Sequence, residues 1–88
     1  MEFEWDEDKN KWNIQERNIS FVYAIRIFSG SVFEQESTRQ DYGEIRIKAI
    51  GKVDDIVLCV VYTLRGEKRR IISVRKASRR ERQIYHAS

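Results

Sequence analysis

Residues 44–75 read EIRIKAIGKVDDIVLCVVYTLRGEKRRIISVR, and this stretch decides the fold class. Apolar and charged residues alternate over 44–53, which is typical of a strand with one buried face. Residues 56–64 are apolar at both sets of alternating positions and therefore predict a central strand. Turns of two or three residues separate these strands from each other and from a third at 68–75. Strands joined by such short turns are antiparallel.

The alternation also assigns side chains to the two faces of these strands. Over 44–53, one face is expected to carry Ile45, Ile47 and Ala49. The opposite face is expected to carry Glu44, Arg46 and Lys48. In the last strand, Ile72 and Val74 are expected to point away from Ile71, Ser73 and Arg75.

The N-terminal third predicts one short strand and two helices. Residues 3–5 alternate as a strand, and Asp6 is a good N-cap for a helix that runs to about Arg17. Asn18 suits a left-handed C-cap, after which Ser20 can cap a second helix. A buried stripe in the second helix is predicted by the i, i+3, i+4, i+7 spacing of Phe21, Ala24, Ile25 and Phe28.

The remaining elements complete an α+β fold with the order β-α-α-β-β-β-β-α. Residues 32–37 predict a short, polar edge strand. Ser78 and Glu81 have the spacing of a capping box, which starts a last helix that runs to about His86. We expect one domain over residues 1–88, with an antiparallel sheet, helices on one face and the other face free.

Composition excludes several classes of protein and points to a polyanionic partner. The chain has 88 residues, 17 Lys and Arg, 14 Asp and Glu, and one cysteine, so a disulfide framework is excluded. No apolar run approaches the roughly 20 residues of a membrane-spanning helix, and a cytoplasmic protein is expected. Residues 1–43 have a net charge of −4 and residues 44–88 a net charge of +7. The basic half predicts binding to RNA, DNA or an acidic protein, although a solvated basic face would give the same count.

The chemistry that these residues can support is limited. Cys59 and His86 are the sole residues of their types, so neither a metal site nor a Cys–His nucleophile is expected, and no cofactor is implied. Cys59 is interpreted as a small buried apolar residue. If the third and last strands flank the central one, Arg46, Lys48 and Arg75 converge beside Tyr85. Such a group can stabilise the phosphoryl charge during metal-independent attack of a ribose 2′-OH, or it can simply hold a phosphate backbone.

Each of these residues also has a structural interpretation. Arg46 and Arg75 could pair with Glu44, Glu81 or an N-terminal acid, and Tyr85 could pack its helix against the sheet. Arg69 and Arg70 alternate, so only one of them can face RNA. Arg79, Arg80 and Arg82 cannot all face one site.

The aromatic residues expected in the core are Trp5, Trp12, Phe21, Phe28 and Tyr62, whereas Tyr42 and Tyr85 could stack on a base.

The order of several short motifs resembles the BrnT family of toxins. In the first half the matching residues are Phe3-Glu4-Trp5-Asp6, Lys9, Asn13-Ile14, Ile19-Ser20-Phe21, Ala24 and Phe28. In the second half they are Asp41-Tyr42-Gly43-Glu44, Arg46, Ile50-Gly51, Val60-Val61-Tyr62-Thr63, Arg70-Ile71-Ile72-Ser73, Arg75, Ala77, Arg80-Glu81-Arg82 and Tyr85. The resemblance spans nearly the whole chain.

The resemblance implies a RelE-like fold and a ribonuclease toxin of a type II toxin–antitoxin pair. The implied partner is BrnA, a ribbon-helix-helix-like antitoxin. The implied complex has two copies of each chain, and it contacts operator DNA only through the antitoxin. Catalytic roles are then expected for Arg46, Arg75, Tyr85 and Lys48. RNA-binding roles are expected for Lys9, Arg70, Arg79 and Arg82.

The departure from the family pattern that bears on activity lies at residues 16–18; Val74 in place of the usual alanine is a harmless one. BrnT sequences usually carry Lys-His-Gly where this chain has Glu16-Arg17-Asn18, and arginine cannot replace a histidine that acts as an acid or base. Two other functions therefore stay open. The chain could be a non-catalytic RNA- or DNA-binding module, or a degenerate toxin that is retained as an antitoxin-binding co-repressor. A protein-interaction module with an acidic partner is a further alternative.

Overall fold

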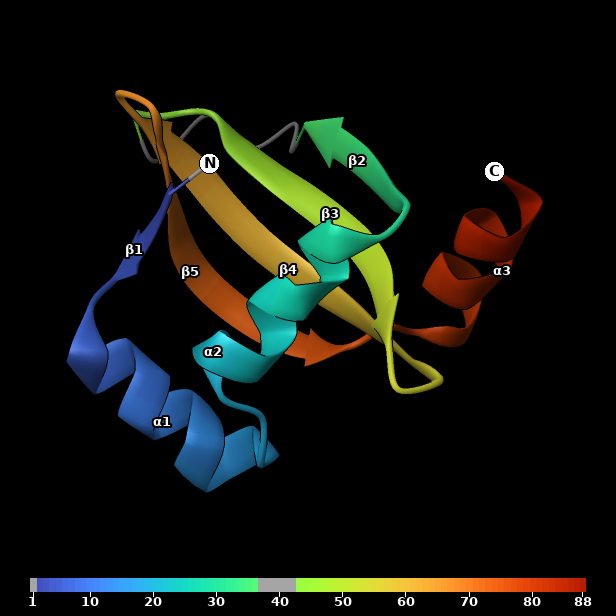
Figure 1. Ribbon diagram of the computed structural model, residues 1–88, viewed down its shortest axis with the longest axis horizontal. Helices are drawn as coiled ribbons and strands as arrows, with labels where there is room; N and C mark the ends of the chain where they lie inside the picture. The colour runs from blue at the N-terminus through green and yellow to red at the C-terminus, as the bar shows by residue number, and fades with distance from the viewer. Residues whose placement is uncertain (1, 37–42) are drawn as a thin grey trace.

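A five-stranded sheet forms the centre of the computed structural model, which describes residues 2–36 and 43–88 (Figure 1). The strands are β1 (Glu2–Trp5), β2 (Val32–Glu36), β3 (Arg46–Val53), β4 (Ile56–Arg65) and β5 (Lys68–Lys76). Their order in the sheet is β1-β5-β4-β3-β2. The predicted central strand is confirmed, because β4 lies in the middle with β3 and β5 antiparallel to it. The predicted edge strand is β2; the last residue of its expected range, Ser37, lies outside the described residues.

The sheet is mixed, so the prediction of a purely antiparallel sheet is wrong. β1 pairs with β5 in parallel, with Trp5 opposite Ile71. The turn argument applies only to strands that follow each other directly through a short connection. α1 (Glu7–Arg17), α2 (Phe21–Ala24), the 3₁₀ helix that follows α2, and three strands lie between β1 and β5 in the chain, so no turn length constrains the direction in which β1 and β5 pair.

The two predicted N-terminal helices are present, and their caps are those expected. α1 (Glu7–Arg17) is capped by Asp6, and Asn18 ends it at φ 59°. α2 (Phe21–Ala24) starts at Ser20, whose hydroxyl accepts a hydrogen bond from the backbone N–H of Tyr23. After one turn the chain continues as a 3₁₀ helix, η1 (Ile25–Ser29).

The change to a 3₁₀ helix alters the buried stripe. Phe21 and Ala24 are buried as predicted, but the third fully buried residue is Ile27 rather than Ile25 or Phe28. A 3₁₀ helix has three residues per turn, so residues three apart lie on one side of it. Ile25 and Phe28 are partly buried at the margin of the core.

α1 lies along the outer edge of β5, beyond the short pairing with β1. The side-chain oxygen of Asn13 accepts a hydrogen bond from the Val74 N–H at 3.2 Å, and Arg17 donates to the Val74 carbonyl at 3.0 Å. These side chains satisfy backbone groups that β1 is too short to reach. Trp12, predicted in the core, is 52% exposed on this helix, and the Arg17 guanidinium lies over its ring.

Gly51 allows η1 to approach β3 closely. A Cβ at this position would lie 2.7 Å from the Cβ of Ile27 and 3.0 Å from a methyl group of Val32. We expect Gly51→Ala to lower the free energy of unfolding by about 2 kcal/mol, because the buried Ile27 and the partly buried Val32 must move. Urea denaturation measures this loss. Gly30→Ala is the matched control, since nothing lies within 4 Å of its Cβ; an equal loss in both variants would contradict the packing argument.

A β-bulge changes which side chains of β5 lie on each face of the sheet. Val61 pairs with Ser73 but Tyr62 pairs with Ile71, so Ile72 is the extra residue. The inserted residue reverses the alternation. Ile71 and Val74 are therefore both buried in the core, and the prediction that they point to opposite faces is wrong.

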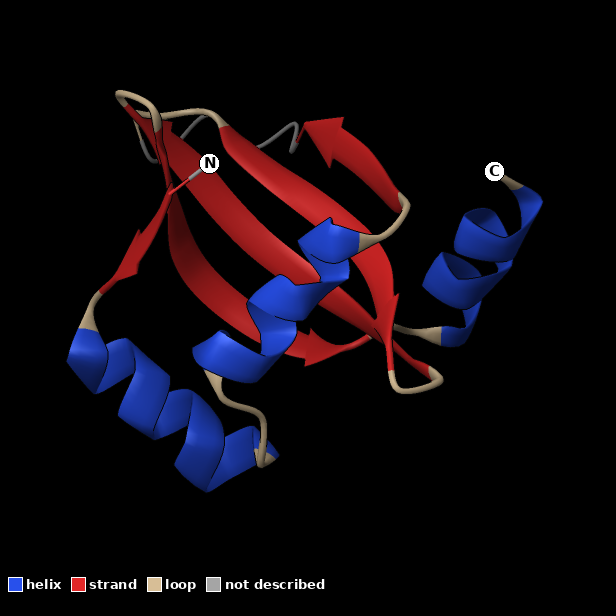
Figure 2. Cartoon of the chain, viewed as in Figure 1, coloured by secondary structure: helices blue, strands red, loops and turns tan. Residues whose placement is uncertain are grey.

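α3 (Arg79–Ala87) stands beside the sheet in Figure 2, apart from α2 and η1, and its packing places it on the opposite face from them. Its Tyr85 packs with Phe33 against a small cluster that contains Ile50 of β3. Ile50 follows Ala49, which faces η1, so the two residues mark opposite faces. The prediction that all helices share one face is wrong for α3. We call the face that carries α3 the open face.

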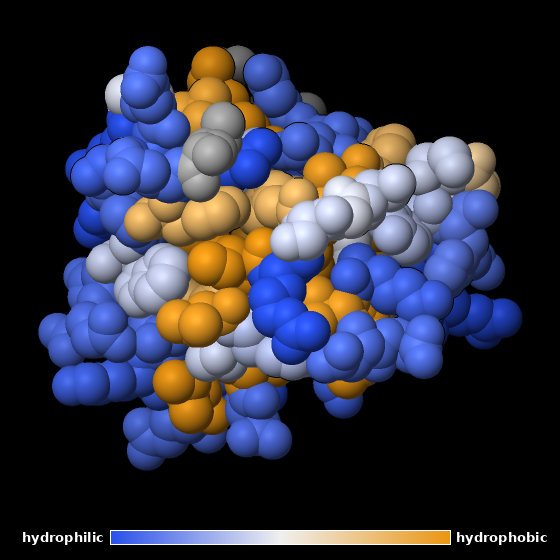
Figure 3. Space-filling model, in the orientation of Figure 1, coloured by the Kyte–Doolittle hydropathy of each residue, from blue (hydrophilic) through white to orange (hydrophobic). Residues whose placement is uncertain are grey.

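The other face is shown in Figure 3. Apolar side chains gather in its middle, and hydrophilic side chains surround them. Within the described part of the chain, no helix is long and apolar enough to cross a membrane.

Candidate active site on the open face

The pairing of strands brings four predicted cations to the open face. Arg46 and Lys48 come from β3, and Arg70 and Arg75 come from β5. Arg46 and Arg70 both pair with Thr63 of β4, from its two sides. The condition stated for convergence, that the third and last strands flank the central one, is therefore met.

One buried carboxylate joins two of these cations. Glu81 Oε1 accepts a hydrogen bond from Arg75 Nη1 at 2.7 Å, and Glu81 Oε2 accepts from Arg75 Nη2 at 2.9 Å. Oε2 also accepts from Lys48 Nζ at 3.0 Å. The Glu81 side chain is 7% exposed, whereas those of Arg75 and Lys48 are 41% and 35% exposed. The expected alternative of an Arg75–Glu81 ion pair is confirmed, and Lys48 shares it. We call these three residues the Glu81 cluster.

The charges in the Glu81 cluster stabilise each other. The hydrogen bonds from the Arg75 guanidinium hold the pKa of the Glu81 carboxyl well below its usual range, against the opposing effect of burial. The backbone N–H of Ser78 and the Lys48 ammonium lower this pKa further. In return, Glu81 raises the pKa of Arg75. Glu81 is thus an anion at neutral pH and a poor proton acceptor.

Cys59 lies next to this cluster, opposite Arg75 in the β4–β5 ladder. Its side chain is fully buried, and burial raises the pKa of the thiol to about 11. The thiol is therefore protonated at neutral pH, which agrees with its interpretation as a small buried residue.

The cations at the other end of the open face are also paired. Arg70 donates to Glu4 of β1 at 2.7 Å. Arg46 and Arg65 lie 3.8 and 3.9 Å from the two carboxylate oxygens of Glu44. The expected Arg46–Glu44 ion pair is present. The open face thus presents cations held by carboxylates rather than a bare patch of positive charge.

Tyr85 occupies the packing position that was its alternative interpretation. It is half-buried against Ile50, Val57 and Ala77, and its hydroxyl donates to the Ser31 carbonyl at 3.1 Å. The tyrosine thus attaches α3 to the sheet and to the start of β2.

The remaining candidates lie around these residues. Arg79 and Arg82 line a shallow hollow of about 530 Å³ on the outer side of α3, together with His86. Lys9 is exposed on α1, an element that contributes none of the four open-face cations. Arg70 faces the open face, while Arg69 lies over the ring of Phe28 on the other, as their alternation predicts. Tyr42 lies outside the described residues.

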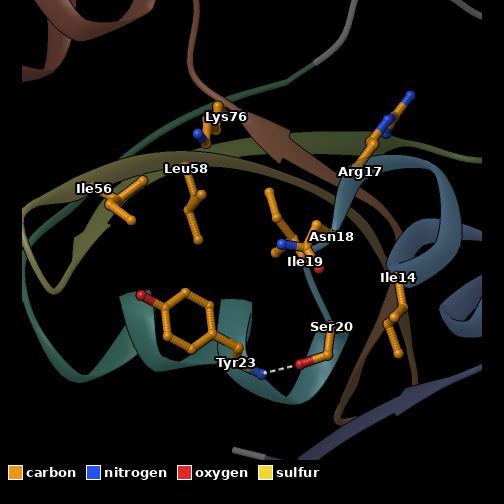
Figure 4. Close-up of a pocket in the computed structure, with 9 residues that line it drawn as sticks. All are labelled: Ile14, Arg17, Asn18, Ile19, Ser20, Tyr23, Ile56, Leu58 and Lys76. Carbon is orange, nitrogen blue, oxygen red and sulfur yellow. Dashed lines mark hydrogen bonds between the residues drawn. The ribbon is translucent and has the colours of Figure 1, made fainter.

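A second hollow, of about 520 Å³, lies between α1, α2 and the start of β4 (Figure 4). Ile56, Leu58 and Tyr23 line it, and the Arg17 side chain points away from it in this view. It contains none of the predicted catalytic residues. Among residues 2–36 and 43–88, no group of three or more His, Cys, Asp or Glu side chains is placed to hold a metal ion.

The comparison with protein families relates this geometry to a known class. The family model described as the ribonuclease toxin BrnT of type II toxin–antitoxin systems matches residues 5–81. The chain belongs to the BrnT family. A search of curated proteins found no match. The BrnT match includes all four open-face cations and Glu81, but it ends before Arg82 and Tyr85.

The contribution of Glu81 to this BrnT site was only partly predicted. The capping-box spacing identified the residue, and an ion pair with Arg75 was an alternative for that arginine. That Glu81 also binds Lys48 depends on where α3 docks, since Lys48 is 33 residues away in the chain. A glutamate at the third position of a helix that follows a basic strand is the one local signal that points to it.

Proposed function

We propose that this BrnT-family chain is an endoribonuclease that cleaves RNA at the open face without a metal ion. The observation that carries the proposal is the placement of Arg46, Lys48, Arg70 and Arg75 on one face, with Arg75 and Lys48 fixed by Glu81. Guanidinium groups held in this way can bind a phosphate and stabilise its developing negative charge. We also propose that the fold is RelE-like.

The proposed reaction uses the ribose 2′-OH as the nucleophile. The O2′–P bond forms and the P–O5′ bond breaks, which leaves a 2′,3′-cyclic phosphate and a 5′-OH end. Arg46 and Arg75 stabilise charge on the phosphoryl oxygens. The 2′-OH proton passes to solvent, and Lys48 Nζ gives a proton to O5′ and regains one from solvent. Tyr85 takes no proton in this scheme because its hydroxyl donates to Ser31, so it supports the position of α3 instead.

Residues around the site are proposed to bind the rest of the RNA. Arg70 lies beside Arg46 across Thr63, and Arg79 and Arg82 extend the basic surface along α3. Contacts of this kind to neighbouring phosphates give binding that weakens as salt rises. Lys9 lies on α1 rather than on the sheet or α3, and in this proposal it would contact RNA beyond the cleaved bond.

The family assigns the chain to a type II system and therefore implies an antitoxin partner. We propose that the partner is BrnA-like, that it forms a complex with two copies of each chain, and that it alone contacts operator DNA. Cleavage of cytoplasmic RNA by the free toxin would arrest translation, and binding of the antitoxin would prevent it.

One observation favours the second candidate, a degenerate toxin that binds RNA or the antitoxin without cleavage. Arg17 stands where the BrnT pattern described above has histidine, and it donates to the backbone of β5. In this position arginine has a structural contact and cannot accept a proton.

Growth after induced expression, together with RNA cleavage in vitro, separates these candidates. We expect the wild type to arrest growth and the Arg46→Ala/Arg75→Ala double variant not to, at equal soluble levels. The purified wild type should cut RNA in the presence of EDTA and leave 2′,3′-cyclic phosphate ends. Salt-dependent binding without products after long incubation would favour the degenerate toxin, and products that disappear on adding EDTA would contradict metal independence.

A further inference from the structure

We propose that Glu81 is a positioning residue of this site: its one buried carboxylate sets the direction of both Arg75 and Lys48. This inference rests on the proposed function, because it assigns Glu81 a part in the same reaction. Glu81 itself is turned inward and does not act on the RNA.

The position of the Glu81 carboxylate is fixed from several directions. Oε1 accepts from the Ser78 N–H at 2.8 Å and from Arg75, and Oε2 accepts from Arg75 and Lys48. The Ser78 hydroxyl in turn accepts from the Glu81 N–H at 3.2 Å. With both oxygens engaged on two sides, a rotation of the carboxylate would break at least one charge-assisted hydrogen bond.

The two cations need such a partner because they come from separate strands. Arg75 lies on β5 and Lys48 on β3, with β4 between them, and their like charges repel. Glu81 bonds both and leaves the Glu81 cluster with a net charge of +1. In the described part of the chain, the Nε–H and one Nη2–H of Arg75 have no partner. These donors remain available for a phosphate.

A helix cap alone would not require this arrangement. The capping box needs one carboxylate oxygen and the Ser78 backbone N–H, and neither Arg75 nor Lys48 takes part in it. Glu81 thus combines two tasks that substitutions can separate. Glu81→Gln keeps an acceptor for the Ser78 N–H but removes the charge that binds the two cations.

The test compares Glu81→Gln with Ser78→Ala, which weakens the cap but leaves the Arg75 and Lys48 contacts intact. At a temperature where both variants are folded, we expect Glu81→Gln to lower kcat for a short RNA by about 10- to 100-fold, with a smaller change in KM, because misplaced groups stabilise the transition state poorly. Ser78→Ala should stay within about twofold of the wild type. Equal kcat values in the two variants would overturn the proposal.

A second readout keeps this test separate from the proposed function. The Nη–H protons of Arg75 bond the Glu81 carboxylate, so in NMR spectra they should exchange slowly with water in the wild type and in Ser78→Ala, and quickly in Glu81→Gln. If the wild type cleaves no RNA, the ribonuclease proposal fails, while this difference would still support the positioning of Arg75. Unchanged exchange of the Arg75 Nη–H protons in Glu81→Gln would overturn the inference, whether or not the wild type cleaves RNA.

Discussion

Arg75→Ala is expected to lower kcat/KM for RNA cleavage by about 10²–10³-fold, the range observed when one preorganised donor to a charged transition state is lost. Arg75 is the open-face cation with the firmest support, because both of its terminal nitrogens bond the Glu81 carboxylate. Its removal also leaves Glu81 with Lys48 as its remaining cationic partner. Cleavage rates of a labelled RNA at several substrate concentrations measure the effect.

Arg26→Ala is the matched control for charge. Arg26 lies on η1, away from the open face, and its exposed side chain pairs with Asp54 at 3.5 Å. Removing it changes the net charge by the same amount and should change kcat/KM by no more than about threefold, since exposed ion pairs contribute little. Equal activity in Arg75→Ala and Arg26→Ala would show that Arg75 is not part of the site.

A second variant separates catalysis from folding. Arg75→Lys retains a positive charge beside Glu81 and should recover most of the stability lost in Arg75→Ala. Lysine is a point charge and cannot bond both carboxylate oxygens in the planar geometry of arginine. We therefore expect Arg75→Lys to be folded but still at least about tenfold less active than the wild type. Full activity in Arg75→Lys would contradict a need for two-point contacts.

The features predicted correctly from the sequence are those that neighbouring residues determine. Asp6, Ser20 and Ser78 begin helices because their side chains accept hydrogen bonds from N–H groups two or three residues later. The predicted C-cap Asn18 adopts a left-handed conformation, which asparagine tolerates. Each of these contacts forms within a few residues of chain, so the sequence alone is sufficient to predict it.

The features predicted wrongly depend on contacts between distant segments. The direction of β1 is set by the free edge of β5, some 66 residues away along the chain. The bulge at Ile72 is a mismatch between two strands, and neither strand shows it alone. The docking of α3 on the open face follows from the fit of Tyr85 to Ile50, which a single helix does not reveal.

In the candidate site, too, the features that neighbouring residues determine were predicted, and those that depend on distant contacts were not. Alternation along β3 predicted that Arg46 and Lys48 share a face. The convergence of Arg75 with them was predicted on the condition that β3 and β5 flank β4, and the structure meets that condition. The ion pairs Arg46–Glu44 and Arg75–Glu81 were among the alternative interpretations of these cations, and the structure contains both. The convergence of Arg75 and Lys48 on one carboxylate could not be predicted, since it requires the position of α3.

Asn13→Ala is expected to produce the largest loss of stability, about 3 kcal/mol in the free energy of unfolding, because it leaves two buried backbone groups without a partner. Asn13 is 1% exposed; its amide donates to the Ile19 carbonyl at 2.8 Å and its oxygen accepts from the Val74 N–H. One side chain thus joins α1, the segment before α2 and the edge of β5. For a chain of this length such a loss lowers Tm by roughly 15 °C.

Gln15→Ala is the matched control, because Gln15 is exposed on the same helix and its replacement should change stability by less than about 0.5 kcal/mol. Thermal and urea denaturation of both variants test the expectation. A loss below about 1 kcal/mol in Asn13→Ala would mean that water satisfies the Val74 and Ile19 groups. A large loss would show that α1 is held to the sheet mainly through the backbone edge of β5, because its apolar residues Trp12 and Ile14 remain 52% and 43% exposed.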